Sequence, residues 1–238
     1  LPPIKKFSNR EFYGGRMRIM KKDTGTDKVI EIVQVPDGKV DFDATRNLPE
    51  IETLVKYLYD MIVEDERKNP DNPVSIGVIS PFRAQVEQLK TSISKVLSEH
   101  MIRKHQIEVG TAHTFQGDER DIILMSWAYA NNSFPQSLVF LQKPNLFNVA
   151  VTRARYKMIN FISKDVKELP DGLFRHYTAY VEEYQNKLEA LKNCRIDENI
   201  YKNNLEKIIA GEIRNLGHEV KAGVEIEGLS ADLLVDGK

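Results

Sequence analysis

The sequence of 238 residues contains a single cysteine, Cys194. An internal disulfide and a cysteine-rich zinc site are therefore excluded within this chain. No apolar run is long enough to cross a bilayer, and the opening residues 1–6 lack the apolar core of a signal peptide. These absences favour a soluble, cytoplasmic protein with no membrane partner.

The sequence also lacks an excess of either charge sign and a histidine pattern typical of metal binding. The net charge of −1 at pH 7 argues against binding of nucleic acid through overall basicity, although local basic patches can still bind it. His100, His105, His176 and His218 have no partner at the spacing of a metal site. We interpret these histidines as surface or packing residues.

Helical and strand patterns alternate through the middle of the chain. Asn47 and Glu50 form an arrangement typical of a helix N-terminus, and apolar residues then recur at helical spacing. The pattern predicts helices over 48–64, 82–97 and 145–154, and strands over 74–79, 106–109, 122–126 and 158–162. Such alternation indicates an α/β fold with a doubly wound parallel sheet.

The regions flanking this alternation differ from it in composition. The predicted segments are an irregular leader at 1–46, the α/β domain at 47–165, a helical linker at 166–196 and a truncated second domain at 197–238. The leader contains one predicted strand over 29–35. The last segment combines a helix over 200–216, stopped by Gly217, with a hairpin over 220–235 that turns at Gly228. We therefore expect a helical and α+β extension at the carboxyl end.

The stretch 109–121 concentrates polar side chains between two predicted strands. Gly117 lies within it, and a glycine lets backbone N–H groups approach an anion. Ligands of doubly wound sheets bind at loops that follow the carboxyl ends of strands, which is where we expect this loop. Its hydrogen-bonding side chains are those of Thr111, His113, Thr114, Gln116 and Glu119. The alternative is an ordinary turn glycine, but a simple turn would not require these neighbours.

Arg153 falls three or four residues beyond Val149 and Ala150, on the buried side of the predicted helix 145–154. A guanidinium held beside an apolar stripe needs a partner, and its planar donors suit a phosphate or a carboxylate. The partner is either an external anion or a carboxylate of the same chain. Arg155 lies about 200° further round an ideal helix, so both arginines could not serve one phosphate.

Several of these stretches together resemble a known family. Residues 111–121 and 148–155 resemble motifs V and VI of superfamily 1 helicases, in the subclass that includes the up-frameshift RNA helicases and many bacterial DNA helicases. Residues 79–85 resemble the strand-to-helix segment before motif V, and residues 3–13 resemble the segment after the family's upstream arginine-bearing motif. The agreement of several motifs in the right order makes this resemblance specific.

The resemblance implies the second RecA-like domain of a helicase, of the P-loop NTPase type, and a role for each matching residue. Arg153 would be the arginine finger on the γ-phosphate. Gln116, Gly117 and Glu119 would bind the nucleotide, with the Gly117 backbone near the phosphates and Glu119 on the ribose hydroxyls. The residues that would face single-stranded nucleic acid are Ser80, Arg83, Thr111, His113 and Thr114.

Three aromatic residues have two interpretations each. Phe82 could stack on a base, but as the first member of a helical apolar stripe it is favoured as core. Trp127 and Tyr129 could form a nucleic-acid platform, but their position beside an apolar strand favours the core for them as well.

The sequence lacks two elements of a complete helicase. It contains no Gly-x-x-x-x-Gly-Lys-Ser/Thr phosphate loop and no Asp-Glu pair after an apolar strand. In this family both belong to the first RecA-like domain, which we expect upstream as an intramolecular partner. ATP and Mg²⁺ would then bind the full-length protein, and the fragment alone would bind neither and would be inactive.

The tail carries a second, weaker resemblance. Residues 205–209, 216–220 and 231–235 resemble the opening of the PD-(D/E)xK nuclease fold, as in very-short-patch-repair-like endonucleases. Glu206 and Asp232 would be magnesium ligands there, and the third element would fall beyond residue 238. The alternative is a solvated glutamate and an ordinary strand-end aspartate.

The favoured function is therefore the motor half of an ATP-dependent helicase that moves on single-stranded nucleic acid. DNA is favoured over RNA only by the nuclease-like tail. The alternatives are an RNA helicase, a nuclease whose α/β part positions substrate, and a binding module that has lost the motor.

Overall fold

The computed structural model describes residues 2–14, 16, 28–41, 45–115, 117–193, 204–226 and 229–236. Its contacts divide the chain into two compact units. The first contains the described residues of 3–18 and 29–183, and the second contains those of 184–236 together with Pro2 and Lys28. Among the described helices, none is both long and apolar enough to cross a membrane.

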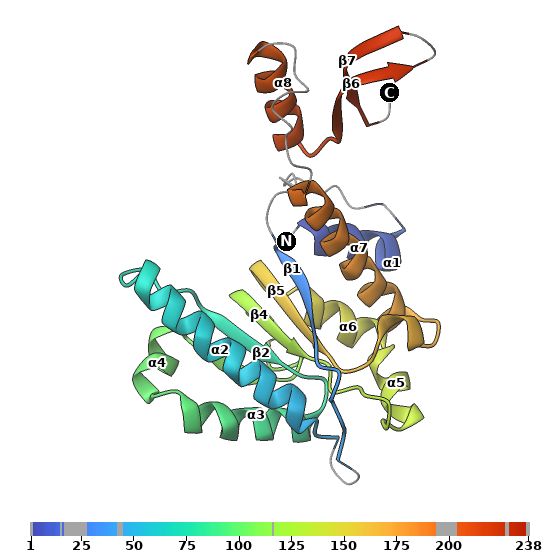
Figure 1. Ribbon diagram of the computed structural model, residues 1–238. Coiled ribbons are helices and arrows are strands. Elements are labelled where there is room, and N and C mark those ends of the chain that lie inside the picture. Colours follow the sequence, from blue (N-terminus) through green and yellow to red (C-terminus); the bar gives the residue numbers. More distant parts are fainter. Residues whose placement is uncertain are drawn as a thin grey trace. The chain divides into compact units, whose positions relative to one another are not determined.

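The first unit is built on a five-stranded sheet whose strands are all parallel (Figure 1). The strands are β1 (Ile30–Gln34), β2 (Ile76–Ile79), β3 (Glu108–Gly110), β4 (Arg120–Ser126) and β5 (Ala154–Ile162), in the spatial order β1-β5-β4-β2-β3. Short apolar strands buried on both faces are typical of such sheets. The predicted doubly wound α/β fold is confirmed.

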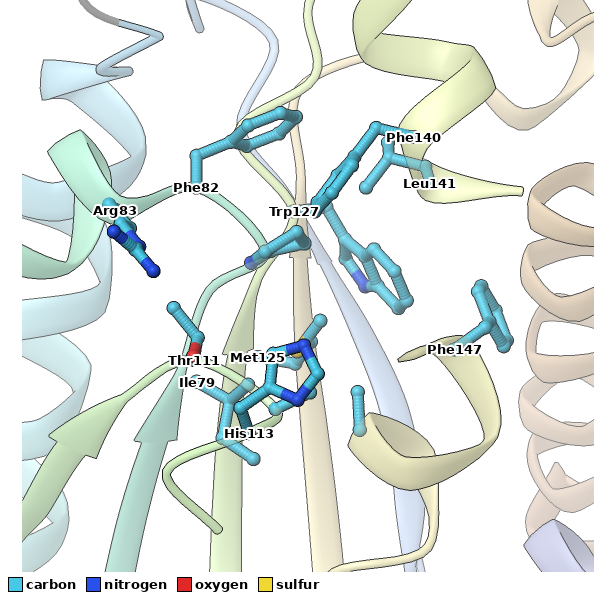
Figure 2. A pocket seen from close by; sticks show the side chains of 13 residues that line it. Ile79, Phe82, Arg83, Thr111, His113, Met125, Trp127, Phe140, Leu141 and Phe147 are labelled. Carbon is cyan, nitrogen blue, oxygen red and sulfur yellow. The ribbon is translucent and has the colours of Figure 1, made fainter. Parts of the chain in front are cut away.

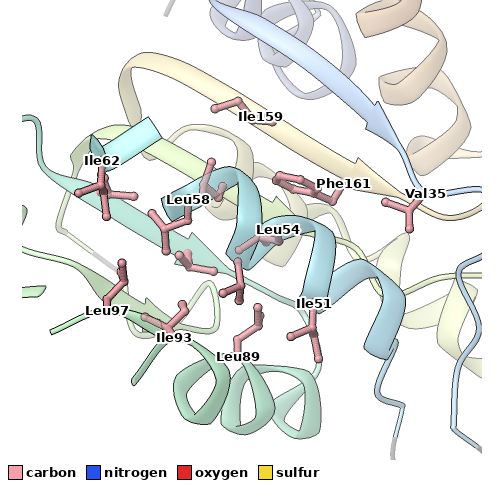
Figure 3. Close-up of a cluster of buried hydrophobic side chains, with 14 residues drawn as sticks. Val35, Ile51, Leu54, Leu58, Ile62, Leu89, Ile93, Leu97, Ile159 and Phe161 are labelled. Carbon is pink, nitrogen blue, oxygen red and sulfur yellow. The ribbon is translucent and has the colours of Figure 1, made fainter. Parts of the chain in front are cut away.

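One face of the sheet is covered by α2 (Leu48–Lys68) and α3 (Arg83–Val96), and α4 (Glu99–Lys104) follows α3. Asn47 caps α2 as predicted, because its side chain accepts a hydrogen bond from the Glu50 N–H. The apolar stripe of α2 packs with α3 on alternate residues of the strands (Figure 3). This core includes Ile51, Leu54, Leu58, Ile62, Leu89, Ile93, Ile76, Val78, Leu124, Ile159 and Phe161.

The opposite face is packed largely with aromatic rings. Trp127 is 1% exposed and lies 4.7 Å from the Phe174 ring and 5.1 Å from the Phe147 ring. Phe7 packs edge-on against Tyr177 at 5.2 Å. Trp127 directly follows β4, and the other rings come from α1 (Pro2–Tyr13), α6 (Pro144–Val151) and the first part of α7 (Leu173–Asn193). The short helix α5 (Pro135–Leu141) precedes α6. The favoured core positions of Trp127 and Tyr129 are confirmed.

This packing changes the expected character of two segments. The start of the leader is the helix α1 rather than irregular chain, because Ile4 and Phe7 lie one turn apart and are both buried. The first part of α7 belongs to the sheet unit rather than to a linker, because Phe174 and Tyr177 are buried in its aromatic core. The predicted strand in the leader is confirmed as β1.

The second unit contains α8 (Asn204–Asn215) and an antiparallel hairpin of β6 (Val220–Ile226) and β7 (Leu229–Val235). The helix and hairpin predicted for this region are confirmed. Gly217 follows α8 with φ of +89°, a conformation that glycine adopts easily. The expected turn residue Gly228 lies outside the described residues.

Candidate functional site

The predicted site residues fall into two groups at opposite edges of the sheet. Arg83 follows β2 and His113 follows β3, so both lie at the carboxyl edge. Glu119 directly precedes β4 and Arg153 directly precedes β5, so both lie at the amino edge. Gly117 also precedes β4, and its expected position at a carboxyl end is therefore wrong. The residues expected to bind the nucleotide and those expected to bind single-stranded nucleic acid therefore lie at opposite edges of the sheet.

The loop 111–119 connects the two edges. Because β2 lies between β3 and β4, this loop has to cross β2 to reach the start of β4. It crosses at Gly77, where an added Cβ would lie 2.8 Å from the Phe115 ring and 2.6 Å from Ile123. Phe115 is fully buried at this crossing. A glycine in β2 and a buried ring in the loop thus hold the connection against the sheet.

A pocket of about 710 Å³ opens at the carboxyl edge. The chain leaves β2 towards α3 on one face and leaves β4 towards α5 and α6 on the other, so the connections diverge between these neighbouring strands. Doubly wound folds bind ligands at such a point. In Figure 2 the side chains of Arg83 and Thr111 lie on one side of the pocket, across from those of Phe140 and Phe147.

Three of the five predicted strand-binding residues, Arg83, Thr111 and His113, line this pocket. Ser80 does not, because it is fully buried and its hydroxyl accepts a hydrogen bond from the Phe82 N–H at 3.4 Å. The buried Ser80 side chain is therefore not accessible to single-stranded nucleic acid, contrary to the expected binding role. Thr114 packs its side chain on Gly110, and its hydroxyl accepts from the Thr111 N–H at 3.2 Å.

Phe82 is not a core residue, contrary to the favoured interpretation. Its ring is half-buried, lines the pocket and lies 5.7 Å from the Phe140 ring. Phe140 belongs to α5, a short helix without a sequence pattern that would have predicted it. Trp127 reaches the pocket from the end of β4 while staying buried. We call the Phe82 and Phe140 pair the aromatic wall of the pocket. Sequence reasoning missed this wall because its two members come from separate segments of the chain.

At the amino edge, Arg153 lies in the connection between α6 and β5. The helix ends at Val151 rather than at 154, because β5 already begins at Ala154. The Arg153 Nε donates to the Val149 carbonyl at 3.0 Å, and the Arg153 carbonyl accepts from the Arg120 N–H at 3.2 Å. Within the described part of the chain, no carboxylate lies within ion-pair distance of Arg153. The alternative of an internal Arg153 ion pair is therefore not observed there.

The neighbouring arginines, in contrast, are paired with carboxylates. Arg155 lies 3.5 Å from Glu119 and 3.8 Å from Asp121. Arg120 lies 2.7 Å from both Glu108 and Asp118, and its hydrogen bond holds the pKa of Asp118 below the ordinary value. The side chain of Glu119 is exposed beside Arg155, and Gln116 lies outside the described residues. These carboxylates are thus paired with Arg120 and Arg155 rather than with Arg153.

A buried carboxyl group at the carboxyl edge was not anticipated. Glu50 accepts hydrogen bonds from the Ser126 hydroxyl at 2.6 Å, the Ser163 hydroxyl at 2.7 Å and the Ala128 N–H at 2.8 Å. Burial raises the pKa of Glu50 to about 7, although these hydrogen bonds oppose the shift. The capping pattern identified Glu50 only as a first-turn residue. Its burial depends on strands that are distant in sequence.

The structure places both tail residues that were predicted as magnesium ligands. Glu206 lies in the first turn of α8 and is partly buried, and Asp232 is exposed in the middle of β7 rather than at a strand end. Among the described residues, no group of three or more His, Cys, Asp or Glu side chains could hold a metal ion. A magnesium role for Glu206 and Asp232 stays a prediction.

Comparison with known proteins agrees with this geometry. A family model described as an AAA domain matches residues 1–165, which covers the whole sheet. The chain belongs to this AAA domain family. Its matches include the human probable helicase senataxin, 30% identical over 180 residues, and a putative helicase MOV-10 of Gallus gallus, 35% identical over 124 residues. The regulator of nonsense transcripts 1 homolog of Arabidopsis thaliana is 26% identical over 211 residues.

These matches cover 75%, 48% and 82% of the AAA domain chain, respectively. They cover only 6%, 13% and 16% of the relatives. A crystal structure of the C-terminal domain of a possible DNA helicase from Lactobacillus plantarum WCFS1 aligns with a TM-score of 0.39 at 13% identity, over 67% of this chain and 83% of that one. The helicase relatives show that this AAA domain is of the helicase type.

Proposed function

We propose that this domain is the second motor half of an ATP-dependent helicase, in which Arg153 supplies the arginine finger. The main support is the set of contacts that the Arg153 guanidinium makes. Its guanidinium is anchored through Nε to a backbone carbonyl and has no carboxylate partner in the described residues. Arg120 and Arg155, by comparison, are both paired with acids. A half-buried guanidinium in this state favours an external anion such as a phosphate.

The rest of the amino edge suits a nucleotide. Gly117 has φ of +88° and no atom within 4 Å of an added Cβ, so its backbone is open to a ligand. We assign the Gly117 backbone to the phosphates, Glu119 to the ribose hydroxyls, and Gln116 to the same ligand. ATP and Mg²⁺ would also need a phosphate loop and acidic magnesium ligands, which a first motor half would supply. The chain alone is therefore expected not to hydrolyse ATP.

The carboxyl edge suits single-stranded nucleic acid. Arg83, Thr111 and His113 meet there around the pocket, and Thr114 supports the same loop. Polar and basic side chains of this kind hold phosphates without reading sequence. The loop 111–119 would then touch the strand at one end and the nucleotide at the other. We propose that it couples the two ligands, with DNA still favoured over RNA.

The test is Arg153→Ala in the full-length protein that contains both motor halves. We expect nucleic-acid-stimulated ATP hydrolysis to fall by about 10³-fold or more, because the finger acts mainly in the transition state. Turnover is measured at saturating ATP with and without a single-stranded oligonucleotide. The matched control is Arg67→Ala, which removes an exposed arginine that pairs with Glu64.

Oligonucleotide binding by the Arg153→Ala protein is measured in parallel and should stay close to wild type. If ATP hydrolysis stays within a few-fold of wild type, the finger assignment is wrong. If Arg67→Ala has an equally large effect, the loss reflects general damage rather than a missing finger.

A further inference from the structure

We infer that the pocket at the carboxyl edge takes up one base of the single strand, which stacks on the aromatic wall formed by Phe82 and Phe140. This inference rests on the proposed function and adds a binding mode to it. Ordinary phosphate contacts would need only the basic and polar side chains of this edge. They would leave an aromatic pocket of about 710 Å³ without a role.

The shape of the pocket suits a flat ring. The Phe82 and Phe140 rings are 5.7 Å apart and tilted by 36°, so they already touch each other and leave no room for a base between them. Both rings are only half-buried, and both face the pocket. A base would therefore stack on the side of the pair that faces the cavity. The volume lies within the range of about 300 to 1,000 Å³ that is usual for small-molecule sites.

The charge around the pocket suits a nucleotide rather than a purely apolar ligand. Arg83 and His113 are exposed and line it, and the Lys143 ammonium lies 5.1 Å from the centre of the Phe140 ring. No Asp or Glu occurs among the lining residues that the structure describes. The interior is lined mainly by apolar side chains, among them Met125 and Trp127. An apolar interior under a basic rim matches a base attached to a phosphodiester.

An apolar peptide is the rival occupant. Such a peptide would gain from the aromatic wall but would make no use of the basic rim. It would also need partners for its own N–H and C=O groups, and the strands next to the pocket, β2 and β4, already have strand neighbours on both sides. The basic rim and the paired strands therefore favour the nucleobase.

The experiment compares two oligonucleotides of equal length and charge, an oligothymidylate and a fully abasic strand. Binding of each to the 238-residue chain is measured by fluorescence anisotropy at constant low salt. Phe82→Leu and Phe140→Leu keep apolar volume in the wall but remove the aromatic face. Each should weaken oligothymidylate binding by about 5- to 150-fold, the range for one base–aromatic stack, and change abasic binding by less than about twofold.

Two further variants serve as controls. Tyr59→Leu removes a ring that is 41% exposed on α2, on the other side of the sheet, and should change neither affinity. Arg83→Gln should weaken both oligonucleotides to the same extent, because a phosphate contact does not depend on the base. Thermal unfolding of every variant shows whether the fold is retained.

The possible outcomes separate this inference from the proposed function. If both leucine variants lose the same affinity for the two strands, or lose none, the base pocket is wrong and a peptide becomes the better occupant. The motor assignment would then still stand on the Arg153 result. If the wild-type chain binds neither oligonucleotide, the base pocket and the proposed strand surface are both wrong.

Discussion

At the scale of single residues, Glu50 owes its chemistry to residues far away in sequence. It lies in the first turn of α2, but its carboxyl group accepts hydrogen bonds from Ser126, 76 residues further along the chain, and from Ser163, 113 residues further along. Gln85 of α3 extends this network by donating to the Ser126 hydroxyl at 2.8 Å. A buried carboxyl group thus joins two helices and two strands at the edge where the pocket opens.

The raised pKa of Glu50 predicts a stability that depends on pH. The group has an ordinary value of 4.5 and a folded value of about 7, so the folded state holds its proton more tightly. This contribution is complete below pH 4.5 and is lost as the pH rises to 7. The free energy of unfolding should fall by on the order of 3 kcal/mol across this window. Urea unfolding between pH 5 and 8 measures the change.

Glu50→Gln provides the comparison for this prediction. Glutamine cannot ionise, so the free energy of unfolding of this variant should stay nearly constant over the same pH range. The variant is expected to be less stable at low pH, because the amide fits the surrounding hydrogen-bond donors less well. Parallel profiles for the wild type and the variant would show that another group causes the pH dependence.

At the scale of elements, the crossing of the loop 111–119 over β2 decides where the site residues lie. The crossing is tight because Phe115 packs directly on the Gly77 backbone. On the same face, α6 lines the pocket with Phe147 and Ala150 and holds Arg153 through the Val149 carbonyl. One loop and one short helix therefore reach both edges of the sheet.

Gly77→Ala tests the crossing. The added methyl group would lie 2.6 Å from Ile123 and 2.8 Å from the Phe115 ring, so the loop has to shift. We expect a loss of about 1 to 3 kcal/mol in the free energy of unfolding, as for other overpacked cores. Chemical denaturation measures it.

The matched control for the crossing is Gly211→Ala. This glycine lies within α8, and its added methyl group would meet no atom within 4 Å. Alanine is a better helix former than glycine, so this variant should not be destabilised. Equal stability of the Gly77→Ala chain and the wild type would mean that the loop does not pack on β2 as described.

At the scale of the whole molecule, the sheet unit extends beyond the predicted α/β domain. The family match ends at residue 165, whereas the compact unit continues to residue 183. The reason is that Phe174 and Tyr177 complete the aromatic core around Trp127. A segment expected to link two domains instead covers one face of the sheet.

Two fragments test this boundary. A fragment of residues 1–165 loses two fully buried rings, each worth about 3 to 5 kcal/mol when truncated, and leaves Trp127 uncovered. It should unfold at a much lower temperature than a fragment of residues 1–193, or aggregate. Thermal unfolding and size-exclusion chromatography compare them. A stable, monomeric 1–165 fragment would restore the boundary near residue 165.

The sequence by itself determined the α/β alternation, the cap of α2 at Asn47 and the hairpin of the tail. These features depend on spacings of two to a few residues, which any reader of the chain can measure. Residue type also pointed to Arg153 as a group that needs an anion.

Only the tertiary structure decided where these residues meet. The burial of Ser80 and Glu50, the place of the half-buried Phe82 at the pocket and the separation of Gly117 from the carboxyl edge depend on how the strands are ordered and how the helices pack on them. Strand order depends on contacts between segments that are distant in sequence, and no local pattern records them. The division of the site residues between the amino and carboxyl edges therefore could not be predicted from the sequence alone.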